Sequence, residues 1–267
     1  MKVLLVDSYN MIYRARHGFG EGPHAVVFNF FRQLKSQIEQ HKPDLVYMVD
    51  EGIPVQSLAI DKNYKGTRVH SDDDGFKRQK KEILEIAKTI LGVRYVRHPE
   101  RECDDVISYL ALEKHKNDEV IVLSTDTDFI QLLDEHNSLK IYNPVKKEFV
   151  ERIPNYAVYK ALKGDPTDNI PGVPGVGHVK ATELASNSLK LNAFLEKHMV
   201  HEVFANAYSM IKFKPVPDNE LIYIDAKFNE QKLLEEFTNR EFKSIIGNAW
   251  PKWVKAFGGI NGEQKAS

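Results

Sequence analysis

Three hydrophobic segments of strand length, each followed by an aspartate, constrain the fold of this chain more than any other feature. They lie at 2–6 before Asp7, at 45–49 before Asp50, and at 119–124 before Asp126 and Asp128. Because stretches of helical periodicity separate them, we expect an α/β fold with a mostly parallel central sheet and flanking helices. Ligands bind outside the carboxyl ends of the strands in such a sheet, so these aspartates mark the expected functional edge.

A further acidic cluster, Glu-Cys-Asp-Asp at 102–105, stands at the start of a predicted helix. Apolar residues recur at helical spacing over 106–111, which places Asp104 and Asp105 in the first turn of that helix. Acidic residues are favoured at helix N-termini, and this preference explains Asp104 or Asp105 alone. It does not explain why carboxylates recur at three strand ends, so we interpret the whole set as one cluster.

The complete set contains nine carboxylates. Such a set predicts binding of hard divalent cations. They are Asp7, Asp50, Glu102, Asp104, Asp105, Asp126, Asp128, Asp165 and Asp168. Mg²⁺ keeps several waters and takes only one or two carboxylates directly, so nine acids suit two ions better than one. Two ions about 4 Å apart activate water and stabilise both oxygens exchanged at a phosphodiester. We expect two Mg²⁺, with Mn²⁺ as the alternative. The ten scattered histidines do not form a zinc set with the single cysteine.

Composition indicates a globular protein that binds a polyanion. The chain has 267 residues, of which 42% are hydrophobic, enough for one sizeable core and a smaller lobe. When the nine clustered acids are set aside, 29 of the 38 acidic residues remain against 37 basic residues, so the rest of the protein is mildly basic. The single cysteine, Cys103, excludes an intramolecular disulfide. The sequence shows neither a signal peptide nor the roughly 20 apolar residues of a membrane span, so we expect a cytoplasmic protein without a membrane partner.

Residues 52–81 interrupt the alternation of strands and helices. The stretch 61–68 is polar with mixed charge, 71–75 is acidic, and the helix predicted over 76–91 opens with several lysines and an arginine. One interpretation is a solvated surface loop followed by a solvated helix. The other is a basic segment near the pocket that contacts phosphates.

A glycine-rich segment at 164–186 follows a helix predicted over 155–164. Gly172, Gly175 and Gly177 permit tight turns, and the chain then continues as a helix through 181–184. This arrangement resembles a helix–hairpin–helix, in which exposed amides and a helix N-terminus face a phosphate. His178 and Lys180 follow the glycines and are candidates for the same contact. A glycine-rich loop without function is the alternative.

The remaining C-terminal sequence is less informative. Short amphipathic helices are expected at 189–197, 202–213, 230–237 and 240–246. Trp250 and Trp253 are interpreted as packing residues. We therefore divide the chain into an α/β core at 1–153, which includes the segment 52–81, a helical lobe at 154–257, and a frayed tail at 258–267.

Five motifs occur in the same order as in the structure-specific 5′ nucleases. They are V-D-S-Y-N-x-x-Y-R at 6–14, Y-K-G-T-R at 64–68, E-C-D-D at 102–105, S-T-D-T-D at 124–128 and G-D-P-T-D-N-I-P-G-V-P-G-V-G at 164–177. The chain resembles the 5′–3′ exonuclease domain of DNA polymerase I and the stand-alone flap endonucleases of phages. This resemblance implies a PIN-like core, a helical arch and a helix–three-turn–helix. Since no polymerase module follows, it implies the stand-alone form.

The resemblance also implies roles for individual residues. The first metal site corresponds to Asp7, Asp50, Glu102 and Asp104, and the second to Asp105, Asp126, Asp128 and Asp168, with Asp165 as an outer ligand. Asp7 and Asp104 are implied to hold the indispensable ion. Lys65 and Arg68 match arch residues that contact the scissile phosphate and the 5′ single strand. Arg14 matches another phosphate contact and Tyr64 a stacking residue. Ser57 stands where the family usually has an arginine, and the hairpin of the family also holds K⁺.

Three other functions were weighed against a nuclease. A haloacid-dehalogenase-like phosphatase needs a second aspartate where this chain has Tyr9. A topoisomerase–primase fold shares Asp-x-Asp after a strand but leaves Asp7, Asp50 and the hairpin unexplained. A binding module that has lost its chemistry conflicts with the complete carboxylate set. The sequence thus predicts a monomeric two-metal phosphodiesterase for 5′ flaps, junctions and 5′ ends of DNA, and for RNA primers in hybrid duplexes, with a role in replication or repair.

Overall fold

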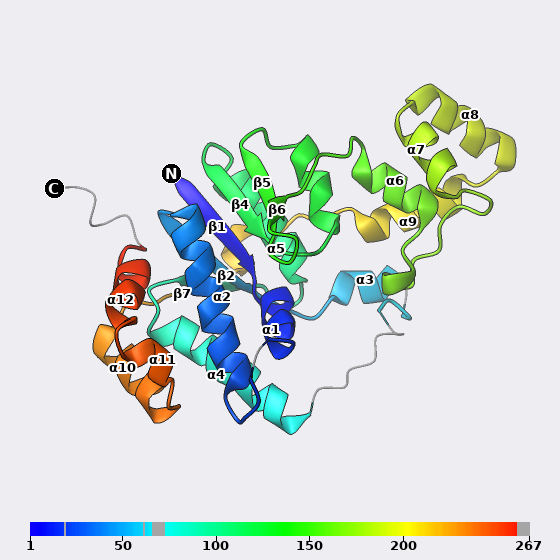
Figure 1. Cartoon of the computed structure of the whole chain (residues 1–267). Helices are drawn as coiled ribbons and strands as arrows, with labels where there is room; N and C mark the ends of the chain where they lie inside the picture. Colours follow the sequence, from blue (N-terminus) through cyan, green and yellow to red (C-terminus); the bar gives the residue numbers. More distant parts are fainter. Residues whose placement is uncertain (19, 61, 66–72, 261–267) are drawn as a thin grey trace.

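The computed structural model describes residues 1–18, 20–60, 62–65 and 73–260, and within these ranges the core is a seven-stranded sheet (Figure 1). The strands follow the spatial order β6-β5-β4-β1-β2-β3-β7. Their bounds are β1 (Lys2–Asp7), β2 (Leu45–Asp50), β3 (Arg94–Arg97), β4 (Glu119–Leu123), β5 (Leu139–Asn143), β6 (Glu148–Phe149) and β7 (Ile222–Asp225). The five inner strands are parallel, and the two edge strands pair antiparallel. The predicted mostly parallel α/β sheet is confirmed.

Side chains of the central strands are buried on both faces of the sheet. In β1, Leu4 and Val6 belong to one hydrophobic cluster, whereas Val3 and Leu5 belong to another. This division follows from the alternation of side chains along a strand. Because helices cover both faces, the central strands read as continuous apolar runs. That continuity is the pattern from which the strands were predicted.

Twelve α-helices surround the sheet in the described part of the chain. They are α1 (Ser8–Arg16), α2 (Ala25–His41), α3 (Val55–Ile60), α4 (Asp74–Thr89), α5 (Cys103–Tyr109), α6 (Tyr156–Lys163), α7 (His178–Ala185), α8 (Ser188–His198), α9 (His201–Ile211), α10 (Glu230–Asn239), α11 (Lys243–Ile246) and α12 (Trp250–Gly258). Helices α1, α2, α4 and α10–α12 contribute to the cluster on one face of the sheet. Helix α5 packs on the opposite face. No helix in the described ranges is both long and apolar enough to cross a membrane.

A separate helical lobe projects from one end of the sheet, where α6 to α9 gather (Figure 1). Helices α7 and α8 enclose a small core that includes Val173, Leu184 and Leu195. A second small cluster joins α6 and α9 to Tyr64, which lies beyond α3. Through Tyr64 the segment 52–81 packs against the lobe as well as against the sheet.

The segment after residue 212 differs most from the sequence-based expectation, which was helices alone. Residues 222–225 form β7, which pairs with β3 at the edge of the sheet. Helices α10 to α12 pack with α2, and Figure 1 shows them at the opposite end of the molecule from α7 and α8. Phe237, Trp253 and Phe257 are buried in this contact. These residues pack with the sheet although the prediction grouped them with the helical lobe. The boundaries of independent domains at 153 and 257 stay a prediction.

One short helix also differs from the prediction. The helix expected at 240–246 begins only at Lys243, because Glu241 has a φ of 56°, which interrupts the helical backbone. Residues 261–267 of the expected tail lie outside the described residues.

Candidate metal centre

Asp7 lies at the point where β1 gives way to α1. Its carboxylate accepts the backbone N–H of Asn10 at 3.0 Å, which caps α1, and the hydroxyl of Ser124 donates to it at 2.8 Å. Burial raises the pKa of Asp7 to about 6, and the nearby charge of Asp126 adds to this effect. An aspartate at this position is therefore costly to ionise unless a cation lies beside it.

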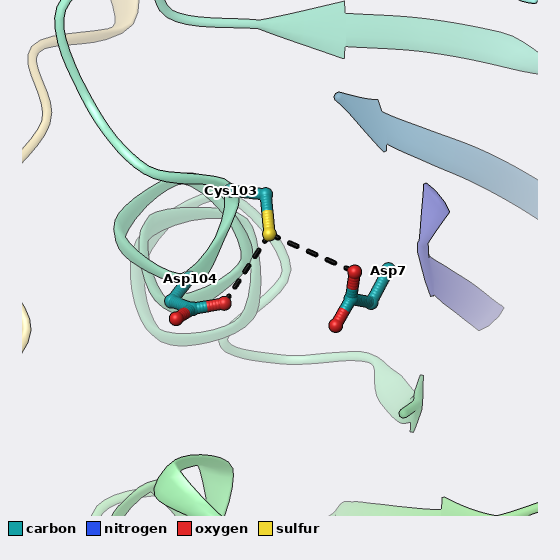
Figure 2. A group of neighbouring side chains, drawn as sticks. All are labelled: Asp7, Cys103 and Asp104. Carbon is teal, nitrogen blue, oxygen red and sulfur yellow. Dashed lines mark hydrogen bonds between the residues drawn. The ribbon is translucent and has the colours of Figure 1, made fainter. Parts of the chain in front are cut away.

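A first group of possible ligands forms where the first turn of α5 approaches the end of β1. One atom each of Asp7, Cys103 and Asp104 lie within 4.8 Å of one another. Figure 2 shows the sulfur between the two carboxylates, 3.2 Å from Asp104 Oδ1 and 3.7 Å from Asp7 Oδ1. Burial, together with Asp126 and Asp7, raises the pKa of Asp104 well above its usual value. Burial and the neighbouring Asp7 raise the pKa of the Cys103 thiol as well, so the sulfur is held as a neutral thiol.

Glu51 joins this group, although the sequence did not single it out. Its Oε2 accepts the backbone N–H of Cys103 at 3.3 Å, and burial raises its pKa to about 7. Glu51 directly follows Asp50 at the end of β2. Its position at a strand end is therefore the sequence signal that could have identified it. Asp50 itself accepts the Tyr95 hydroxyl and the Glu51 N–H, the latter at 2.9 Å.

Residues of the segment 52–81 reach the centre through Glu102. The Lys65 ammonium forms an ion pair with Glu102, and the hydroxyl of Tyr64 donates to the same carboxylate at 3.2 Å. Burial alone would lower the pKa of Lys65, but Glu102 and neighbouring acids raise it above its usual value. The Tyr64 ring is only 7% exposed, and its stacking role stays a prediction. Arg68 lies outside the described residues.

Ser57 belongs to the same network. It is buried and donates to Glu102 at 3.4 Å, and the Lys214 ammonium donates to its hydroxyl at 2.8 Å. Lys214 therefore places a positive charge beside the position where the resemblance implies an arginine. No sequence pattern points to Lys214, because it is more than 150 residues away from Ser57 along the chain.

A second group of possible ligands faces the helical lobe. Asp128, Asp165 and Asp168 each offer an oxygen, and these atoms lie within 4.8 Å of one another. Lys160 of α6 forms ion pairs with Asp128 and with Asp165, the latter at 2.6 Å. Burial raises the pKa of Asp128 to about 6, and Asp126 adds to the rise. For Asp165 burial acts in the same direction, but the ion pair with Lys160 outweighs it and lowers the pKa.

Asp126 connects the two groups, whereas Asp105 points elsewhere. The charge of Asp126 raises the pKa of Asp7, Asp104 and Asp128, so it lies within electrostatic reach of both groups. Asp105 instead accepts the backbone N–H of Lys214 at 2.8 Å. Successive residues of a helix point about 100° apart, so Asp104 and Asp105 cannot both face Asp7. The two groups thus contain five of the nine predicted acids, and the other four lie outside them: Asp50, Glu102, Asp105 and Asp126.

Comparison with known proteins agrees with this geometry. Residues 2–162, more than half of the chain, match the family model for the 5′-3′ exonuclease, N-terminal resolvase-like domain. The chain belongs to the 5′-3′ exonuclease family. The predicted resemblance is confirmed, and the mostly parallel sheet with flanking helices is the PIN-like 5′ nuclease fold.

Two curated members of the family differ greatly in length. A 5′-3′ exonuclease of Aquifex aeolicus is 30% identical, over 92% of this chain and 94% of the relative. The thermostable DNA polymerase I of Thermus aquaticus is also 30% identical, over 73% of this chain but only 25% of the relative. The chain therefore spans about a quarter of the length of the polymerase relatives that it matches.

Solved structures share the fold at lower identity. The T5 D15 protein co-crystallised with metal ions has a TM-score of 0.63 and 20% identity, over 79% of this chain and 89% of that one. Human GEN1 in complex with Holliday junction DNA has a TM-score of 0.58 and 18% identity, over 96% and 71% of the two chains.

The residues present fit the divalent ions that the exonuclease fold implies. Their donor atoms are buried or half-buried carboxylate oxygens, which hard cations prefer. Burial, together with the neighbouring acids, raises the pKa of Asp7, Asp104 and Asp128, and a bound cation would favour their ionised forms. A pocket of about 440 Å³ adjoins the second group, between Asp126 and Asp128 on one side and Lys160 and Asp168 on the other.

The predicted DNA contacts of this exonuclease-family chain are spread over three parts of the chain: the segment 52–81, the hairpin and α1. At the hairpin, Gly175 has a φ of 75°, and no atom lies within 4 Å of where a side chain would begin at Gly175 or Gly177. Gly172 instead packs against the backbone of Lys163 and Gly164. Lys180 lies over the Phe194 ring, and the Tyr159 hydroxyl lies 3.0 Å from His178 Nδ1.

Arg14 of α1 is a further predicted contact within the described residues. One of its nitrogens donates to Gln33 at 2.7 Å. The other terminal nitrogen, Nη1, is buried and has no hydrogen-bond partner among the described residues. Such a group is costly to leave unsatisfied, and a phosphate oxygen would satisfy it.

Proposed function

We propose that the chain is a divalent-metal-dependent 5′-3′ exonuclease and flap endonuclease. The observation that carries this proposal is the pair of carboxylate groups around Asp7 and Asp128, with Asp126 between them. They lie at the carboxyl end of the parallel sheet, where ligands bind in such folds. The bond cleaved is a phosphodiester of DNA, with the 3′ oxygen as leaving group and a 5′-phosphate on the product.

The residues divide into those that would hold ions and those that would bind the phosphate. Asp7 and Asp104 would hold the first ion, and Asp128, Asp165 and Asp168 the second. When bound, two Mg²⁺ or Mn²⁺ ions would activate a water and stabilise charge on the entering and leaving oxygens. Lys65, held by Glu102 beside the first group, would place its ammonium against the scissile phosphate. Asp126 would contribute negative charge to both ions.

The substrate follows from basic surface, the hairpin and the relatives. A T5 D15 flap endonuclease with 20% identity is described with DNA and metal ions, and the Aquifex aeolicus relative is named a 5′-3′ exonuclease. We propose that this chain acts as a monomer in the cytoplasm on 5′ flaps, junctions and 5′ ends, and on RNA primers in hybrid duplexes, during replication or repair. A K⁺ ion at the hairpin belongs to the same proposal.

Cleavage of a 5′-flap duplex labelled at either end tests this function. With Mg²⁺, the protein should release products from the 5′ side, and EDTA should abolish the reaction. Asp7→Asn should be inactive but bind DNA within a few-fold of the unchanged protein. Glu148→Gln, an exposed acid on an edge strand, serves as the matched control and should cleave normally. Cleavage in EDTA, or Asp7→Asn turnover within tenfold of normal, would refute the proposal; DNA binding without cleavage would indicate a binding module.

A further inference from the structure

Lys160 is a buried cation inside the second acidic group. Its side chain is 11% exposed, and its ammonium forms ion pairs with both Asp128 and Asp165. These two carboxylates, with Asp168, are the oxygens that would hold the second ion. The ammonium therefore already contacts two of the three carboxylates on which that ion would depend.

A divalent ion and the ammonium cannot both be bound there without repulsion. The three carboxylates carry three negative charges, and Lys160 neutralises one of them. An ion held by the same oxygens would stand within a few ångströms of the ammonium, where like charges repel strongly in a partly buried site. The four-carbon side chain of Lys160 lines the pocket of about 440 Å³, so the ammonium has room to move off the carboxylates.

We propose that Lys160 is the internal counter-cation of the second acidic group. It stabilises the ion-free protein, and it weakens the second divalent ion, which binds fully only when the ammonium leaves Asp128 and Asp165. This inference rests on the proposed two-ion function and concerns how tightly the second ion binds compared with the first. Within the described ranges, no lysine or arginine forms an ion pair with Asp7 or Asp104, and Lys65 pairs with Glu102 instead. The second ion should therefore bind more weakly than the first.

The test measures ion binding and unfolding, without catalysis. Ca²⁺ is titrated calorimetrically into the unchanged protein and into Lys160→Met, and thermal unfolding is followed with EDTA and with Ca²⁺. Lys160→Met should bind the second Ca²⁺ roughly tenfold more tightly or better. It should also melt at lower temperature in EDTA, because two buried carboxylates lose their partner, and Ca²⁺ should restore more stability than in the unchanged protein.

Lys163→Met is the matched control. Lys163 lies one turn further along α6 and is exposed, with its ammonium 5.8 Å from the centre of the Tyr159 ring. The control removes the same charge from the same helix but should alter the second-ion affinity less than threefold. If Lys160→Met does not fold, Lys160→Gln replaces it, since the amide can still donate to the carboxylates without a charge.

Two results would overturn the inference. One is a second Ca²⁺ bound no more tightly by Lys160→Met or Lys160→Gln than by Lys163→Met, including no second ion in any of them. The other is an unchanged melting temperature in EDTA. A protein that fails to cleave the 5′-flap duplex refutes the proposed function instead, and that failure is seen in a separate experiment with separate readouts.

Discussion

At the scale of single residues, two lysines supply positive charge to the carboxylates of the candidate centre. Lys65 and Lys160 each form an ion pair with a carboxylate of the centre, one from the segment beyond α3 and the other from α6. Lys65 also has a φ of 55°, a conformation that non-glycine residues seldom adopt. Such strain is retained where surrounding contacts enforce it, here the ion pair with Glu102 and the Lys65 N–H bond to the Asp168 carbonyl at 3.4 Å.

Lys65→Ala should slow cleavage without preventing ion binding. Loss of one charged donor at a transition state costs several kcal/mol, which corresponds to roughly a hundredfold or more in rate. Single-turnover cleavage of a 5′-flap duplex in Mg²⁺ measures the effect. Lys62→Ala is the control, because Lys62 is exposed on the same segment and should lose less than threefold. A Lys65→Ala rate within threefold of normal would remove Lys65 from the reaction.

The ion-free protein should become less stable as the pH rises from 5 to 7.5. The pKa of Asp7 and of Asp128 is raised to about 6, and that of Glu51 to about 7, all by burial. Acids with a raised pKa in the folded state bind protons more tightly there than in the unfolded chain, so stability is present at low pH and is lost as the pH passes 6 to 7. For Asp7 alone the whole loss, between its ordinary pKa of 3.8 and the raised value of about 6, is on the order of 3 kcal/mol, and roughly half of it falls above pH 5.

Thermal unfolding in EDTA at pH 5, 6 and 7.5 measures this loss. With Mg²⁺ the fall in melting temperature should be smaller, because the ion favours the ionised carboxylates. Glu51→Gln should remove part of the fall. A melting temperature in EDTA that rises over this pH range would contradict the assigned cause.

At the scale of elements, the hairpin combines a glycine needed for packing with glycines open to a ligand. A side chain at Gly172 would begin 2.4 Å from the Lys163 backbone, whereas at Gly177 nothing lies within 4 Å and the φ of −89° suits any residue. Gly177→Val should therefore fold normally but weaken duplex binding about tenfold, because the backbone can no longer approach a phosphate closely.

Gly172→Ala should instead impair folding, with a lower melting temperature and reduced activity on every substrate. Duplex binding by fluorescence anisotropy, cleavage of short single strands and thermal unfolding separate the two variants. If Gly177→Val lost duplex and single-strand activity equally, the hairpin would be a structural element and not a DNA contact.

The elements that could be predicted are those whose signal is local. Strands β1, β2 and β4 are buried on both faces, so their apolar runs are visible in the sequence. Strand β7 could not be predicted, because Ile222 and Ile224 are partly exposed at a sheet edge and the partner β3 is more than 100 residues away. The same distinction applies to the site. Asp7 and Asp126 follow from strand ends, whereas Lys160 and Lys214 depend on where the lobe meets the sheet.

At the scale of the whole molecule, the described parts of the segment 52–81 contact both the carboxylates and α1, and the resemblance implies that the segment forms an arch for a 5′ strand. Lys65 lies against Glu102, while Asp73, at the start of α4, is 3.5 Å from Arg16 of α1. Residues 66–72, which include Arg68, lie outside the described residues, so the predicted arch stays a prediction.

If the segment forms an arch, cleavage should depend on whether a block on the flap is added before or after the enzyme. A bulky protein bound to the 5′ end of the flap before the enzyme is added should inhibit cleavage, because the free 5′ strand must pass through the arch. The same block added after the enzyme should have little effect. Single-turnover cleavage in both orders is the measurement, and equal inhibition would favour the solvated loop and helix.

After the helical lobe the chain forms β7, which joins the sheet. The lobe is therefore an insertion whose two ends both connect to strands of the sheet. Residues 222–260 supply an edge strand to the sheet and the helices α10 to α12, which share a core with α2. A backbone cut in the exposed stretch 217–220, made at an introduced protease site, should therefore leave two fragments that remain associated. They should elute together from a sizing column and separate only in denaturant. Because the sheet holds the chain on both sides of the lobe, we expect the hairpin to remain near the carboxylates.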